Sequence, residues 1–187
     1  MTAPKRSGFQ TLVQTRHKVW FALRISGIAL LAAASCRVVY GEFGPPLIFN
    51  STASEPRGIY WLSAAPAGGP ARGELVVLAF PPRYEPLALE RKWVMPGRPL
   101  LKGVGAVPGD LVCIGDTRIA INHKDVGPVL RVDSKGRPLP QIEGCTVVAR
   151  GSFLPLSTYI PNSFDGRYMG AQPNSLIRGI AHPLWTF

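Results

Sequence analysis

Turn-forming residues recur along the whole chain at short intervals and divide it into short segments. The 187 residues include 19 prolines and 20 glycines, which are spread along the sequence rather than concentrated in one region. Proline interrupts helices and both residues mark turns, so this distribution favours many short strands over long helices. We therefore expect one mostly β domain of short antiparallel strands and turns, preceded by a short N-terminal appendage.

Apolar runs between these turns give the expected strands. The segment 74–80 is continuously apolar after Glu74, which is typical of a strand buried on both faces. Only residues 86–94 have the composition of a soluble helix. We expect the folded domain to begin near Leu47, with strands at residues 58–62, 74–80, 100–107, 111–114, 118–122 and 146–149.

An apolar stretch follows a basic tail at the amino terminus. The tail, residues 1–18, carries four lysines and arginines, and the stretch from Val19 to Cys36 is interrupted only by Arg24. Its length is close to the roughly 20 residues that span a bilayer, and the positive flank should stay cytoplasmic. We predict a transmembrane or signal segment at 19–40 and an exported domain at 41–187. A cleaved signal peptide and a buried soluble helix are the alternatives.

Charge and cysteine content restrict the partners. A formal charge of +10 favours anionic surroundings, either phospholipid or nucleic acid. The basic residues are scattered and form no nucleic-acid-binding motif, so we expect membrane lipids and no nucleic acid. No Cys/His spacing resembles a zinc site, and we expect no metal or cofactor. Cys113 and Cys145 would lie in the exported part, where an oxidising compartment permits a disulfide if the fold brings them together.

Two separated segments offer a serine nucleophile and a lysine base. Ser54 begins the sequence Ser-Glu-Pro-Arg-Gly-Ile-Tyr, and Lys102 lies in the apolar run 100–107, which leads into Pro-Gly-Asp. Serine is inert until a base takes its proton. A lysine is such a base only when it is neutral, and burial among apolar neighbours lowers its pKa from about 10.4. The residues around Lys102 predict this burial.

A third segment, residues 161–170, reads Pro-Asn-Ser-Phe-Asp-Gly-Arg-Tyr-Met-Gly. The Ser54 turn, the strand 74–80, the Lys102 segment and this third segment occur in an order that resembles the type I signal peptidases, and most closely the TraF-type conjugal-transfer peptidases. The resemblance covers about residues 47–187. It implies that Ser54 is the nucleophile, that Lys102 is the general base, and that Asp165 supports activity.

Two positions depart from the pattern of the family. The bulk signal peptidases have proline three residues after the serine, whereas Pro56 is two residues after Ser54, as we associate with the TraF branch. Ser51 is therefore an alternative nucleophile, although Ser54 adjoins the turn whose backbone N–H could face an oxyanion. Gly166 stands where many relatives have serine.

Each of these residues also has a purely structural explanation. Ser54 could stabilise its turn, and Lys102 could protect an edge strand against pairing. Asp165 could pair with Arg167 or cap a turn. The sequence Gly-Val-Gly at 103–105 suggests a phosphate loop, but no Gly-Lys-Ser/Thr follows it and no helix is expected there, so we reject this interpretation.

The resemblance implies a membrane-attached Ser/Lys peptidase that cleaves an exported precursor through an acyl-enzyme. Its substrate would be a conjugative pilin subunit or another precursor that bears a signal peptide, and the resemblance to the TraF branch further implies that the cleaved pilin is cyclised. The protein would reside in the bacterial inner membrane with its catalytic domain in the periplasm, beside the conjugative transfer apparatus. Two alternatives stay open: a general signal peptidase that uses water, and a non-enzymatic envelope component of a conjugation or secretion machine.

Overall fold

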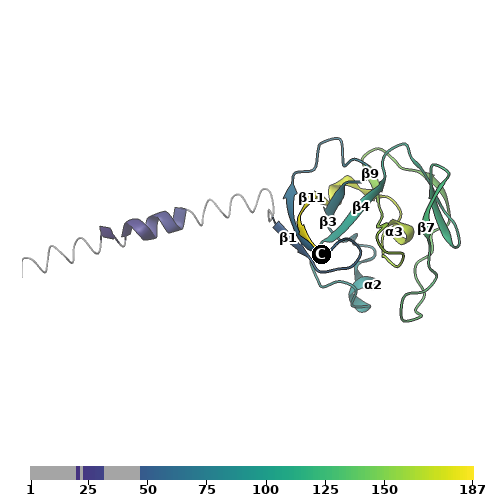
Figure 1. Ribbon diagram of the computed structural model, residues 1–187, viewed down its shortest axis with the longest axis horizontal. Coiled ribbons are helices and arrows are strands. Elements are labelled where there is room, and N and C mark those ends of the chain that lie inside the picture. Colours follow the sequence, from purple (N-terminus) through teal and green to yellow (C-terminus); the bar gives the residue numbers. More distant parts are fainter. Residues whose placement is uncertain (1–19, 22, 32–46) are drawn as a thin grey trace, which may run out of the picture. The chain divides into compact units, whose positions relative to one another are not determined.

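The computed structural model describes residues 20–21, 23–31 and 47–187 (Figure 1). The chain divides into two units, residues 1–44 and 45–187. In the first unit, residues 20–21 and 23–31 are helical. Among the described residues, no helix combines the length and the apolar character needed to cross a membrane. The predicted basic tail and most of the predicted segment 19–40 lie outside the described residues.

The second unit is mostly β, as predicted, and its larger sheet has seven strands (Figure 1). Their order is β1-β2-β11-β3-β4-β9-β10, and every neighbouring pair is antiparallel. The strand that carries Lys102, β4, lies between β3 and β9 in the interior of the sheet. The strands are β1 (Leu47–Asn50), β2 (Gly58–Ser63), β3 (Leu75–Leu78), β4 (Leu100–Ala106), β9 (Ser152–Pro155), β10 (Gln172–Pro173) and β11 (Ile177–Thr186).

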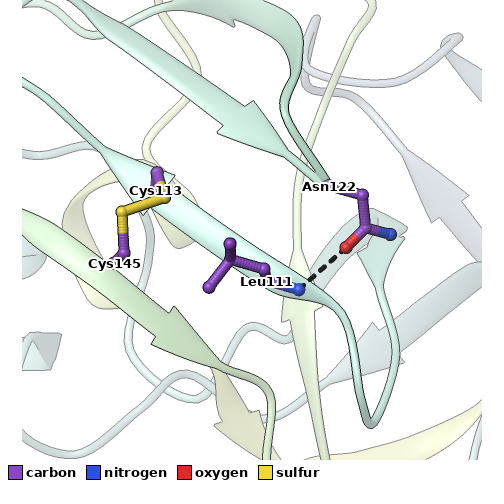
Figure 2. The surroundings of a disulfide bond; sticks show 4 residues. All are labelled: Leu111, Cys113, Asn122 and Cys145. Carbon is purple, nitrogen blue, oxygen red and sulfur yellow. Dashed lines mark hydrogen bonds between the residues drawn. A yellow bond between two sulfur atoms is a disulfide. The ribbon is translucent and has the colours of Figure 1, made fainter.

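A second sheet has four antiparallel strands in the order β7-β6-β5-β8. Cys113 and Cys145 are directly opposite one another in β5 and β8 and form a disulfide (Figure 2). The fold thus brings the two cysteines together, which was the condition for the disulfide that the sequence permits. The strands are β5 (Leu111–Ile114), β6 (Arg118–Ile121), β7 (Lys124–Pro128) and β8 (Gly144–Val147).

The turn between β6 and β7 is fixed by Asn122 and His123. Both residues have positive φ angles, 50° and 67°, which the two central residues of a type I′ hairpin turn require. The Asn122 side chain also reaches the neighbouring strand, where its Oδ1 accepts a hydrogen bond from Leu111 N at 2.9 Å (Figure 2). This contact ties the hairpin to β5.

The larger sheet is buried on both faces around β3. Val76 and Leu78 belong to one apolar cluster, whereas Val77, between them, belongs to another. Side chains alternate between the two faces of a strand, so a strand covered on both sides is apolar at every position. This confirms the interpretation of the run 74–80. A third cluster fills the space between the four-stranded sheet, β9 and α3 (Gly166–Met169).

The helix expected at residues 86–94 is shorter than predicted. It forms α2 (Glu85–Glu90) and ends because Lys92 adopts a left-handed conformation, with φ of 59°. Lys92 N then donates to Leu89 O and Trp93 N to Ala88 O, which is the pair of bonds of a Schellman motif. The predicted strand at 146–149 is displaced as well, since β8 begins at Gly144. A short 3₁₀ turn, η1 (Asn174–Leu176), precedes β11.

Candidate active site

The turn that carries Ser54 connects β1 to β2 and is organised by Asn50. The buried Asn50 side chain donates from Nδ2 to the carbonyl oxygens of Thr52, Glu55 and Pro56, at 3.0–3.1 Å. Its Oδ1 accepts from Thr52 N and Thr52 Oγ1. One side chain therefore satisfies most of the polar backbone of the turn and fixes where Ser54 lies.

Ser54 is half-buried. Its Oγ lies 3.5 Å from Thr52 Oγ1, and its carbonyl oxygen accepts a hydrogen bond from Ser157 Oγ. In the described part of the chain no hydrogen bond joins Ser54 to Lys102, although both residues line one cavity. Such bonds are often long in the absence of substrate. Ser51 lines the same cavity and is exposed.

Lys102 lies in the interior strand β4, and only 4% of it is exposed. This excludes the alternative in which it protects an edge strand. Its Nζ donates to Ser163 Oγ at 2.7 Å. Burial lowers the pKa of Lys102, and the charge of Arg167 lowers it further, whereas Asp165 and Glu55 oppose the change. The environment thus favours the neutral amine that a general base requires.

Gly103 lets another segment come close to β4 beside the lysine. Leu156 N donates to Gly103 O at 2.8 Å, and a Cβ on Gly103 would lie 2.9 Å from Leu156 O. A larger residue would push residues 156–157 away from the strand. The glycines at 103–105 therefore serve close packing within a strand, which agrees with the rejection of a phosphate loop.

Asp165 is completely buried and does not line the cavity. Its carboxylate accepts from Ser157 N at 3.0 Å and from Arg167 N at 3.2 Å, and it forms an ion pair with Arg167 Nη1 at 3.3 Å. Arg167 Nη2 in turn donates to Ser157 O at 2.6 Å. Asp165 therefore both caps α3 and pairs with Arg167, which are the two structural roles expected from the sequence. Through Ser157 it also supports the backbone of Ser54.

The absence of a hydroxyl at position 166 has a steric reason. A Cβ on Gly166 would lie 2.6 Å from both Leu154 Cδ1 and Pro155 O. Real Cβ atoms do not approach this closely, so β9 and the start of α3 could not pack together with serine at this position. The close packing of β9 against α3 thus explains why this chain has glycine at position 166, where many relatives have serine.

Ser163 and Glu55 are two buried polar residues near the lysine that sequence reasoning did not single out. Ser163 is 2% exposed and holds the lysine amine, and its only signal in the sequence is its place two residues before Asp165. Glu55 is 7% exposed, and its Oε1 accepts from Gly103 N at 3.2 Å. Burial raises the pKa of the Glu55 carboxyl above its ordinary value.

A cavity of about 1050 Å³ opens beside these residues. Ser54, Lys102 and Ser163 contribute polar groups to it, and its walls are mostly apolar. The walls come from β1, from the segment 92–101 and from residues 130–139, which include Leu130 and Leu139. Its size and lining suit an extended peptide segment with apolar side chains.

Comparisons with known proteins show which family the chain belongs to. The family model described as "Signal peptidase, peptidase S26" matches residues 20–185. The chain is 33% identical to the "Conjugal transfer protein TraF" of Agrobacterium fabrum, over 88% of this chain and 96% of that protein. It is 28% identical to a "Plasmid transfer protein TraF" from Escherichia coli, over 87% of this chain and 95% of that one.

A solved structure of a signal peptidase I from Enterococcus faecalis aligns with 63% of this chain and 98% of its own, with a TM-score of 0.37 and 20% identity. The family model spans most of the chain, and the TraF proteins match nearly their whole length. This protein therefore belongs to the signal peptidase family, peptidase S26, and is of the TraF type.

Proposed function

We propose that this protein is a Ser/Lys peptidase in which Ser54 is the nucleophile and Lys102 the general base. The observation that carries the proposal is the buried lysine amine, which is held by Ser163 Oγ at 2.7 Å in a cavity that Ser54 also lines. Burial of a lysine amine costs free energy even when the amine is hydrogen-bonded, and such a group beside a cavity is a candidate for a functional residue. In a family of serine peptidases, such an amine can serve as the general base.

In the proposed reaction, neutral Lys102 takes the Ser54 proton as the hydroxyl oxygen attacks a peptide carbonyl. The carbonyl carbon forms a bond to Ser54 Oγ, and the resulting oxyanion is stabilised by backbone N–H groups of the nucleophile turn, at about 3 kcal/mol per donor. Lys102 then gives its proton to the leaving amine, and an acyl-enzyme remains. Asp165 acts indirectly, as a positioning residue, because it holds Ser157 against the Ser54 carbonyl.

The substrate is an extended segment of an exported precursor. In the described part of the chain, β1 is one of the two edge strands of the larger sheet, pairs only with β2 and lines the cavity with all four of its residues. An extended peptide can add to such an edge through main-chain hydrogen bonds and place its side chains in the cavity. We propose a conjugative pilin subunit as the precursor, because the relatives are plasmid and conjugal transfer proteins.

The proposed location is the bacterial inner membrane, with the peptidase domain in the periplasm beside the conjugative transfer apparatus. The Cys113–Cys145 disulfide supports an oxidising compartment. The net charge of +10 supports contact with anionic lipid headgroups. Cyclisation of the pilin would require its amino terminus to reach the acyl ester before water does, which a cavity closed around the bound peptide would favour.

The test incubates membranes that contain the full chain with the matching pilin precursor and records the intact masses of the products. A product lighter by one water than the linear cleaved peptide, absent with Ser54→Ala, is expected for a cyclising peptidase. A linear product would indicate a hydrolytic signal peptidase instead. If Ser51→Ala abolishes cleavage and Ser54→Ala does not, Ser51 is the nucleophile instead of Ser54. Ser175→Ala, at an exposed serine in η1, is the matched control.

The non-enzymatic envelope role predicts that Ser54→Ala supports normal conjugation. The amount of protein must be measured in the same cells, because a lower amount would itself reduce transfer. Normal transfer and unchanged product masses with Ser54→Ala would overturn the peptidase proposal.

A further inference from the structure

Glu55 is a buried carboxyl group that the reaction described above does not use. It follows Ser54 directly in the sequence and is 7% exposed. Glutamate is rarely buried to this degree, because transfer of its charge out of water costs free energy. Its backbone already serves the nucleophile turn through the bond from Asn50 Nδ2 to Glu55 O, so the turn itself needs no carboxyl at this position.

The carboxyl connects the two halves of the site. Glu55 Oε1 accepts from Gly103 N at 3.2 Å, and Gly103 is the residue after Lys102. The hydrogen bond therefore joins the neighbour of the nucleophile to the neighbour of the base, across 48 positions of sequence. The Ser54 carbonyl is bound separately, by Ser157 Oγ on another segment. The Glu55 bond is thus a direct link between the Ser54 turn and β4.

The same carboxyl acts on the charge of the lysine. The ionisable groups that face Glu55 are Lys102 on β4, Asp165 at the start of α3 and Tyr60 on β2, and Arg167 acts on Lys102 from the same helix start. Asp165 and Arg167 neutralise one another in an ion pair. Asp165 has the larger effect on the pKa of Lys102, and Glu55 is the second carboxylate whose charge opposes its deprotonation.

We propose that Glu55 is a positioning residue that holds the Ser54 turn against the Lys102 strand, and that its charge raises the pH at which Lys102 becomes an active base. The inference rests on the proposed function, because it assigns Glu55 a role in the Ser54/Lys102 reaction. The two roles are separable: the hydrogen bond needs only an acceptor oxygen, whereas the electrostatic effect needs a charge.

Glu55→Gln separates them, because the amide keeps an oxygen for Gly103 N and removes the charge. A negative charge near an ammonium raises the pKa of the amine, so its removal lowers the pKa of Lys102. The rising limb of kcat/KM against pH should then move to lower pH by about one unit. The plateau at high pH should stay within about twofold of wild type.

Glu55→Ala removes the acceptor as well as the charge. We expect the same shift of the rising limb together with a plateau reduced about 10- to 100-fold, because displacement of the nucleophile by about 1 Å costs that much. Glu90→Gln, at an exposed glutamate of α2 outside the cavity, is the matched control and should leave the profile unchanged.

A measurement without turnover keeps this inference separate from the proposed function. The full chain with Ser54→Ala, labelled with ¹³C at the lysine ε-carbons, gives the pKa of Lys102 by NMR, and Lys102→Gln assigns the resonance. Glu55→Gln in that background should lower this pKa. If wild type cleaves no substrate but the pKa falls, the peptidase function fails and the electrostatic role of Glu55 stands. An unchanged pKa, or a Glu55→Gln profile that superimposes on wild type, would overturn the inference.

Discussion

Asp165→Asn removes one charge from the most completely buried ion pair that the structure describes. Asp165 is fully buried and Arg167 is 1% exposed. The asparagine keeps one acceptor oxygen, so the bonds from Ser157 N and Arg167 N compete for it. The guanidinium keeps its bonds to carbonyl oxygens, including Ser157 O, but no longer has a counter-charge.

The expected loss of stability follows from this stranded charge. Removal of one partner of a buried ion pair costs about 3–5 kcal/mol, because the other charge stays out of water without compensation. For a protein of this size, 1 kcal/mol lowers Tm by about 2–4 °C. We therefore expect Asp165→Asn to lower Tm by roughly 6–20 °C. Peptidase activity should fall as well at temperatures where the protein is folded, because Ser157 supports the Ser54 carbonyl.

The assay is thermal unfolding of the full chain, followed by circular dichroism with the disulfide intact. Asp125→Asn is the matched control, because Asp125 pairs with Arg118 at 2.6 Å but the two side chains are 50% and 57% exposed. Solvent screens such an exposed ion pair, so the Tm of Asp125→Asn should stay near that of wild type. Arg167→Met added to Asp165→Asn should recover part of the loss. A Tm for Asp165→Asn within about 2 °C of wild type would refute the reasoning.

Three further predictions concern packing and the base. Gly166→Ser should lower the free energy of unfolding by about 1–3 kcal/mol in urea, because its Cβ would overlap Leu154, and stability equal to wild type would contradict the packing argument. Wild-type kcat/KM should rise with pH and reach its plateau below pH 10.5, the ordinary pKa of lysine, because burial lowers the pKa of Lys102. Lys102→Arg should be inactive at every pH, since a guanidinium stays charged, and activity in this variant would exclude Lys102 as the base.

Local patterns in the sequence were sufficient for the strands that lie between clear turns. β2, β4, β5 and β6 occupy nearly the predicted residues, because apolar runs and Pro/Gly turns are local signals. The long strand β11 was missed, since it contains His182 and Pro183. Proline is disfavoured inside a sheet, but the pairing of β11 with β3 ends at Ala181, so beyond that point only β2 is a neighbour.

The site was predictable only where residue type alone indicates chemistry. The burial of Lys102 was predicted because the lysine lies in an apolar run, and the structure confirms that burial. Ser163 and Glu55 could not be identified, because their roles depend on contacts across 61 and 48 positions of sequence. The bond from Ser157 Oγ to the Ser54 carbonyl spans 103 positions. Spacing along the chain carries no information about such pairs.

One short segment, residues 154–157, connects the stability of the domain to the geometry of the site. It lies against Gly103, Gly105 and Gly166, where any Cβ would come within 3 Å of it. Ser157, at its end, holds the Ser54 carbonyl. A side chain added at any of the three glycines would therefore displace the segment and move Ser54, the proposed nucleophile. For this reason, such substitutions should reduce activity even at temperatures where the domain stays folded. If these glycines affected only the stability of the fold, the folded variants would keep full activity.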